Sequence, residues 1–163
     1  MASEAGVIHG VVENISRSIA LTDEVTSTAM GSFTDAQTRM IGALEDIQRI
    51  ATDMPLTAPE SLGPLALKLS ERYSELASDS RLAIATLSSP NLAQKLRVAV
   101  QKLGTSCIEL VKIAGQRRSY PEDLVEFFVF SLFLMLLLVI SSLLLSSLSL
   151  SVSLLLIYSS LNQ

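Results

Sequence analysis

The sequence predicts an all-α protein: an up-and-down bundle of four amphipathic helices followed by an apolar C-terminal helix. Apolar residues recur at alternating spacings of three and four over most of the chain, which is the period of a helix with one buried face. Proline or glycine separates the repeating stretches. Every charged side chain lies at or before Glu126. The sequence therefore divides into a helical bundle over residues 1–124 and a Leu- and Ser-rich tail over residues 125–163.

The first helix is expected between Ala5 and the polar stretch 22–31. Its apolar stripe consists of Ala5, Ile8, Val12, Ile15 and Ile19. A second helix is expected to begin at Ser32, whose hydroxyl can cap it, with Asp35 completing a capping pattern. Its stripe consists of Phe33, Ala36, Met40, Leu44, Ile47, Ala51 and Met54. Pro55 and Pro59 prevent its continuation.

The third helix is expected after a second capping pattern at Thr57 to Glu60, and it runs to about Ser88. Its stripe consists of Leu62, Leu65, Leu69, Tyr73, Leu76, Ser80, Ala83 and Leu87. Pro64 lacks an N–H donor, so it predicts a kink or a delayed start near that position.

The fourth helix has the most regular pattern, and it begins at Ser89 as N-cap with Pro90 in the first helical position. Its stripe consists of Leu92, Leu96, Ala99, Leu103, Cys107, Leu110 and Ala114, and Gly115 ends it. Short connections between the helices predict antiparallel neighbours and small packing angles.

Catalytic, cofactor and metal sites are not expected. One cysteine, Cys107, excludes an intramolecular disulfide, and with one histidine, His9, it cannot make a tetrahedral metal site unless carboxylates complete it. Cys107 lies in the predicted core, which indicates an inert thiol. His9 lies at the margin of its stripe, where a packing role is expected. No convergent set of titratable groups indicates an enzyme or a small-molecule substrate.

Several ordered blocks of sequence stand out along the predicted helices. In chain order they are Ala5-Gly6-Val7, Gly31-Ser32-Phe33-Thr34-Asp35, Glu60-Ser61-Leu62-Gly63-Pro64-Leu65-Ala66, Tyr73, Leu76-Ala77-Ser78, Val100-Gln101-Lys102-Leu103-Gly104, Cys107 and Ala114-Gly115. These blocks resemble one five-helix bundle of the talin rod, most closely the eleventh. The resemblance extends over about three quarters of the chain, from Ala5 to Leu124. Together the blocks are specific, although each alone is weak.

The resemblance implies a cytoplasmic adaptor that links integrin tails to the actin cytoskeleton at focal adhesions, on the inner face of the plasma membrane. It also implies that the first helix resembles a vinculin-binding helix, whose apolar stripe stays hidden until tension releases it. The vinculin candidates are Ile8, Val12, Ile15 and Ile19. The start of the chain lacks the basic and apolar regions of a signal peptide, which agrees with a cytoplasmic location.

Residues 92–118 contain six basic side chains and one acidic one. The basic side chains are Lys95, Arg97, Lys102, Lys112, Arg117 and Arg118. They are a candidate surface for an integrin tail, actin or acidic lipid headgroups, and the alternative is an ordinary solvated face. Nucleic-acid binding is not expected, because the net charge is −4 and no aromatic residues alternate with the basic ones.

The tail departs from the resemblance at Val125, where the family has an amphipathic fifth helix. Without a fifth helix to cover its core side chains, the bundle would lose on the order of 10 kcal/mol of folding stability. We therefore expect the truncated bundle to be loose, to aggregate or to be bound to another molecule. A transmembrane helix at about Phe127 to Ser147 would make a tail-anchored membrane protein with a cytoplasmic binding head. The other interpretation is translated intron sequence, because these residue types can be encoded by pyrimidine-rich codons.

Overall fold

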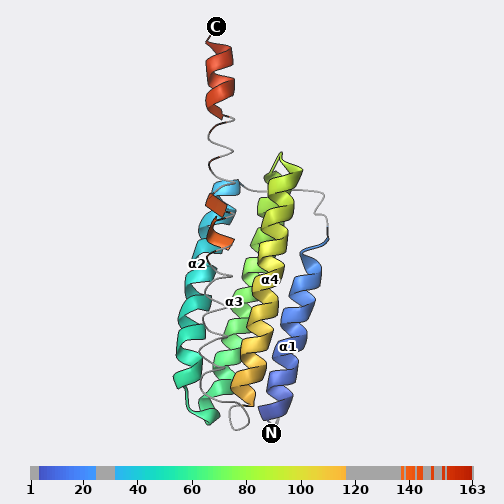
Figure 1. Ribbon diagram of the computed structural model, residues 1–163, viewed down its shortest axis with the longest axis vertical. Coiled ribbons are helices and arrows are strands. Elements are labelled where there is room, and N and C mark those ends of the chain that lie inside the picture. The colour runs from blue at the N-terminus through green and yellow to red at the C-terminus, as the bar shows by residue number, and fades with distance from the viewer. Residues whose placement is uncertain are drawn as a thin grey trace.

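The computed structural model describes residues 4–24, 32–116, 137, 139–141, 143–144, 148, 152 and 154–162. Four long helices form the bundle: α1 (Glu4–Leu21), α2 (Phe33–Asp53), α3 (Pro59–Thr86) and α4 (Pro90–Gly115), with a short 3-10 helix, η1 (Met54–Leu56), after α2. They run alternately up and down (Figure 1). Within the described ranges there is no strand. The predicted all-α bundle is therefore confirmed.

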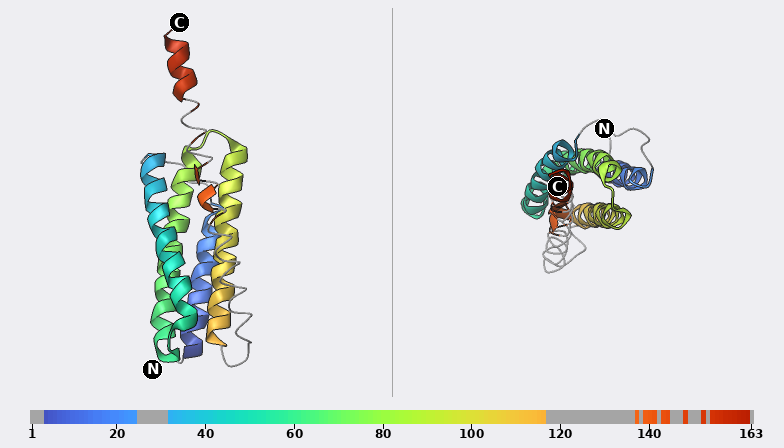
Figure 2. Two further views of the ribbon diagram at one scale, coloured as in Figure 1. Left: turned by 60° about the vertical axis from the view of Figure 1, so that its left-hand side comes forward. Right: turned by 90° about the horizontal axis from the view of Figure 1, so that it is seen from above.

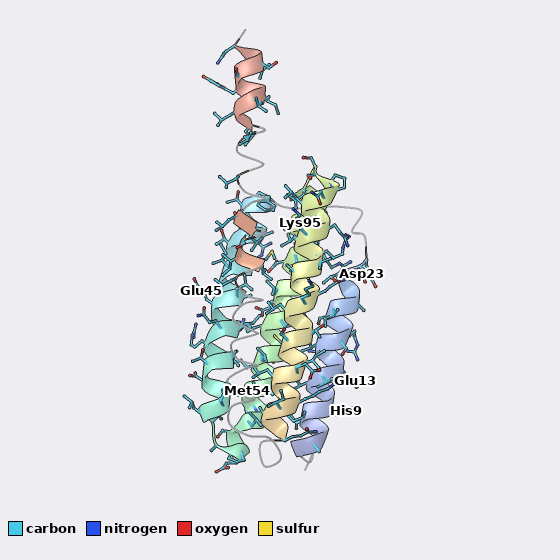
Figure 3. The ribbon with its side chains drawn as sticks, in the orientation of Figure 1. His9, Glu13, Asp23, Glu45, Met54 and Lys95 are labelled. Carbon is cyan, nitrogen blue, oxygen red and sulfur yellow. The ribbon has the colours of Figure 1, made fainter. Side chains whose placement is uncertain are left out.

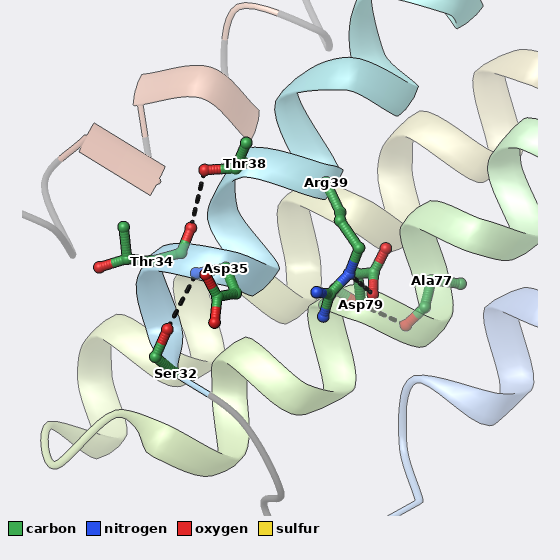
Figure 4. Close-up of polar contacts among 8 residues, drawn as sticks. Ser32, Thr34, Asp35, Thr38, Arg39, Ala77 and Asp79 are labelled. Atoms are coloured by element: carbon green, nitrogen blue, oxygen red, sulfur yellow. Dashed lines mark hydrogen bonds and ion pairs between the residues drawn. The ribbon is translucent and has the colours of Figure 1, made fainter.

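Serine caps start two of the helices, as the sequence predicts. The Asp35 N–H donates to Ser32 Oγ over 3.1 Å at the start of α2 (Figure 4). The Leu92 N–H donates to Ser89 Oγ over 3.4 Å at the start of α4, where Pro90 occupies the first turn. These bonds satisfy backbone donors that have no partner within the helix.

The start of α3 differs from the prediction in two ways. The N-cap is Ala58 with no side-chain bond, and the Thr57 hydroxyl donates instead to the Asp53 carbonyl over 2.8 Å. The capping role predicted for Thr57 is therefore wrong, because Pro59 in the first turn leaves one fewer donor to satisfy. A delayed start is also wrong, because α3 begins at Pro59 and continues through Pro64.

Packing on both sides of Pro64 explains why the helix continues through it. Leu62 and Ala66 are buried, at 4% and 0% exposure, so unwinding this turn would remove both from the core. Pro64 itself is exposed and removes one backbone hydrogen bond near the helix start. The burial of its neighbours outweighs that single loss.

The helix α3 has three neighbours in the bundle, because it packs against α1, α2 and α4. The helix α1 also packs against α4, whereas α2 packs extensively on α3 alone among the long helices. Seen from above, α2 and α4 lie on either side of the helical piece at residues 139–141 (Figure 2). The core contains most of the predicted stripe residues of the four helices, among them Tyr73, Leu103 and Cys107 with no exposed surface, whereas Ala5 is exposed and Leu92 lies outside the core cluster.

The structure describes the apolar tail only in part. Of the described residues, none belongs to a helix that is long and apolar enough to cross a membrane. Most of the expected span Phe127 to Ser147 lies outside the described residues. Residues 139–141 are helical, residues 154–161 form the apolar helix beyond the bundle (Figure 1), and Val139 and Leu143 belong to the core cluster.

Candidate protein-binding site

The helix α1 presents the four candidate residues for vinculin binding to the rest of the bundle. Ile15 is fully buried, and Ile8, Val12 and Ile19 are half-buried and pack against the core. All four therefore contribute to the interface that α1 forms with α3 and α4. In the closed bundle this stripe is largely covered.

The most deeply buried line of α1 and its first following residue shares only Ile15 with the predicted stripe. It runs through Val11, Ile15, Ser18 and Thr22, at 1%, 0%, 4% and 1% exposure. Sequence reasoning missed Val11 because two of the four positions on this line are polar. The spacing of four, three and four was the available signal.

Two polar side chains of α1, one in this line and one beside it, bind α3 directly. Asn14 Nδ2 donates to Ser70 Oγ, and the Ser18 and Ser74 hydroxyls share a hydrogen bond of 2.8 Å. Ser18 Oγ also lies 3.0 Å from the Asn14 carbonyl, to which it can donate. The contact between α1 and α3 is thus partly polar, and water can replace each of these bonds when the helix leaves.

The C-terminal end of α1 is attached to α4 through Thr22, which follows the last helical residue. Arg97 Nε donates to the Thr22 carbonyl over 3.1 Å. Gln101 Nε2 donates to Thr22 Oγ1 over 2.9 Å and to Asp23 Oδ1 over 2.8 Å. Asp23 lies at this end of α1 in Figure 3. These bonds fix the helix end to the bundle.

The N-terminal end of α1 borders a groove against the end of α4. The groove is lined by Ala5, Ile8, His9, Val12, Lys112, Gly115 and Gln116. Two of the four candidate residues, Ile8 and Val12, thus line an open recess at this end. His9 is exposed and lies near the lower end of the helix in Figure 3. The packing role expected for it gains no support from this position.

Among the four long helices, α1 contributes least to the core. Its buried apolar residues are Val11 and Ile15, whereas α2 has eight buried apolar residues, α3 seven and α4 nine. The buried apolar area sets most of the free energy that holds a helix in a bundle. Of the four long helices, α1 therefore has the fewest fully buried apolar side chains that must be exposed when the helix detaches.

The candidate basic residues do not share one face. Lys95 and Lys102 are exposed and two turns apart, so they lie on the same side of α4. Arg97 is half-buried and bound to Thr22, and Lys112 pairs with Glu109 over 3.8 Å. Arg117 and Arg118 lie outside the described residues. The described part of this set is two exposed lysines and two side chains with intramolecular partners.

Cys107 lies in the core, as predicted. It has no exposed surface, and desolvation raises the pKa of its thiol from about 9 to about 12. A thiol with such a pKa is protonated at neutral pH, and the protonated form is a poor nucleophile. The part of the chain that the structure describes also holds no group of three or more residues suited to binding a metal.

Comparison with known proteins identifies the family. The model of the vinculin binding site family matches residues 32–127, which include α2, α3 and α4 and begin after α1. That match does not test the four candidate residues on α1. The chain is 35% identical to talin-2 of Homo sapiens, 33% to talin-1 of Gallus gallus and 32% to talin of Oscarella pearsei, over 126 residues in each case.

Each alignment covers 75% of this chain and 5% of the relative. The chain thus spans about a twentieth of the length of the talins that it matches. The match to the family model extends over more than half of the chain and coincides with three packed helices. The chain therefore belongs to the vinculin-binding-site family and represents a talin-type rod segment.

Proposed function

We propose that this chain is an adaptor module whose α1 leaves the bundle and binds the vinculin head. The observation that carries the proposal is the way α1 is held. Its aliphatic stripe faces the core, its two buried apolar residues are the fewest of any long helix, and two of its contacts with α3 are hydrogen bonds between polar side chains. The family match and the similarity to talins support vinculin as the partner.

The closed bundle and the partner compete for the same apolar surface. Ile15 and the half-buried Ile8, Val12 and Ile19 cannot enter a groove of another protein while they pack on α3 and α4. Burial of an aliphatic side chain stabilises by about 1.5–3 kcal/mol, so release of α1 exposes surface worth several such contributions. A helix groove that accepts the stripe recovers that free energy.

In the longer protein, we propose that the module links integrin receptors to actin filaments in the cytoplasm at focal adhesions. The similarity to three talins over 75% of the chain supports this role, and we assign the module no catalytic activity. In such a chain of modules, tension would supply the free energy that detaches α1.

A peptide of residues 5–21 tests the binding face. We expect it to bind the vinculin head, and we expect Ile15→Asp to abolish that binding because a carboxylate would enter an apolar groove. Ser16→Asp is the matched control, because it adds the same charge at an exposed neighbouring position. Calorimetry measures both affinities. Equal binding by the Ile15 variant would exclude this stripe.

A disulfide between α1 and α3 tests release in the intact chain. The Ser18 and Ser74 oxygens are 2.8 Å apart, so Ser18→Cys with Ser74→Cys places two sulfurs within bonding reach. The oxidised double variant should not bind the vinculin head under conditions where the reduced form does. Each single variant is a control for the substitution itself. If the oxidised form binds as well as the reduced form, the binding helix is not α1.

A further inference from the structure

The uncharged tail contributes two side chains to the bundle core. Val139 is 0% exposed and Leu143 is 1% exposed, and both belong to the same cluster as the buried residues of α2, α3 and α4. Ile140 is half-buried against the same cluster. We infer that the described tail residues 137, 139–141, 143 and 144 pack between α2 and α4 as an intramolecular ligand and take the place of a fifth helix.

The packing of the long helices leaves α2 and α4 without an extensive contact with each other. The helix α4 packs on α1 and α3, and α2 packs on α3, so α2 and α4 share no extensive interface. Figure 2 shows the helical piece at residues 139–141 between α2 and α4 when the bundle is seen from above. Figure 4 shows the same piece beside the first turns of α2.

The piece has one buried side and one exposed side. Val139 and Leu143 are four residues apart and buried, which is the spacing of one helix face. Leu137 and Leu144 are 45% and 54% exposed. Because the tail is apolar on all sides, its sequence does not determine which face is buried. The buried face is therefore selected by packing against the bundle.

A hydrogen bond between α2 and the tail supports this placement of Val139 and Leu143 against the bundle. Gln37 Nε2 of α2 donates to the Leu143 carbonyl over 3.4 Å. Phe33 and Met40 lie one turn to either side of Gln37 on the same face of α2, and they are 8% and 0% exposed. The tail thus covers an apolar part of α2, and Gln37 binds a backbone acceptor of the tail.

Four substitutions in the full chain, measured by thermal unfolding without lipid or detergent, test the inference. We expect Val139→Asp and Leu143→Asp to lower Tm by about 10 °C or more, because each places a carboxylate in the core. Leu137→Asp and Leu144→Asp are matched controls on the exposed side, and their Tm should change by about 2 °C or less. Equal effects at all four positions would overturn the inference.

Two further measurements cover the cases in which the charged variants do not fold or the tail binds another copy. Leu143→Ala should lower Tm, and Leu144→Ala should leave it nearly unchanged. The difference between these two should be the same at all protein concentrations, because the contact is within one chain. A difference that grows with concentration would assign the groove to a second copy and overturn the inference.

Discussion

Gly104 lets α4 approach both α1 and α3 at one position. A Cβ built there would lie 2.6 Å from Ile19 Cγ1 and closer still to the ring of Tyr73. Tyr73 cannot move away easily, because it is fully buried and its hydroxyl donates to the Val100 carbonyl over 2.8 Å. Ile19, one of the four candidate vinculin contacts, is thus placed by a glycine on another helix.

We therefore expect Gly104→Ala to lower the free energy of unfolding by about 1–3 kcal/mol, although alanine favours helix more than glycine does. Gly42→Ala is the control, because nothing lies within 4 Å of a Cβ at that exposed position of α2. It should stabilise by about 0.5–1 kcal/mol. Urea unfolding measures both, and stabilisation by both variants would contradict the tight contact.

The buried thiol of Cys107 predicts a loss of stability in alkali. Its pKa rises from about 9 when unfolded to about 12 when folded, because burial disfavours the thiolate. Between these values the unfolded chain has lost a proton that the folded chain keeps. Stability is therefore unaffected below pH 9 and falls as the pH rises from about 9 towards 12.

Cys107→Ala removes this contribution, so its stability should fall less steeply over that pH range than that of the wild type. The difference in slope should approach about 1.4 kcal/mol per pH unit. Burial also raises the pKa of Tyr73, and this effect is common to both proteins, whereas the smaller contribution of Cys107 to the Tyr73 pKa is removed together with the thiol. Unfolding by urea at a series of pH values gives both slopes, and parallel slopes would show that the thiol is accessible.

At the level of elements, the periodic sequence predicted the four helices and most of their ends. Ser32 and Ser89 cap where they were expected, and α3 ends at Thr86, two residues before the expected Ser88. The errors at Thr57 and Pro64 have different causes. Pro59 leaves one fewer backbone donor for Thr57 to cap, and the burial of Leu62 keeps the helix intact through Pro64.

The candidate site was only partly predictable for a related reason. The sequence identified Ile8, Val12, Ile15 and Ile19 as apolar, but the extent of burial depends on the neighbours of α1. Ser18 and Thr22 are buried because α3 and α4 supply partners such as Ser74 and Gln101. No pattern within α1 contains that information.

Because α1 has the fewest buried apolar residues of the long helices, we predict that it detaches from the bundle before the other helices unfold. We expect its backbone amides to exchange hydrogen through a partial opening of lower free energy than global unfolding, while amides in the middle of α3 exchange only on global unfolding. Native-state hydrogen exchange at increasing urea measures both. The oxidised Ser18→Cys/Ser74→Cys variant should bring the two values together. Equal values in the unmodified chain would mean that α1 does not open first.

At the scale of the whole molecule, the path of the chain decides how a load acts on α1. Ala5 and Gln116 line the same groove, so α1 begins and α4 ends at one end of the bundle. Ser88, in the connection between α3 and α4, lies at the opposite end (Figure 1). The docked residues 139–143 lie beside the start of α2, which is also at that opposite end.

The sequence could not predict this path, because residues 127–163 carry no charge and no alternation that would select one face. Val139 and Leu143 pack on an apolar surface that forms only after the four helices have packed together. While this contact holds, a load between Ala5 and the tail pulls on opposite ends of the bundle. Once the contact breaks, the same load pulls on Ala5 and Gln116 at one end.

These two geometries predict different opening forces for α1, and forced unfolding depends on the barrier along the direction of pulling. Handles on Ala5→Cys and Gln116→Cys peel α1 from α4 one turn at a time, because the two helices are antiparallel neighbours. Handles on Ala5→Cys and Ser88→Cys shear the parallel helices α1 and α3, so Val11, Ile15 and the Ser18–Ser74 bond are loaded together. Cys107 does not compete for the handles, because it is buried and protonated.

We therefore expect α1 to open at a lower force with the first pair of handles than with the second, measured by single-molecule stretching at one loading rate. Added vinculin head should prevent its return in both cases, because the released stripe is then covered. Equal forces in the two geometries would mean that another helix opens first. Since the docked tail selects the shear geometry, Leu143→Asp should lower the opening force measured between Ala5 and the end of the tail, whereas Leu144→Asp should not.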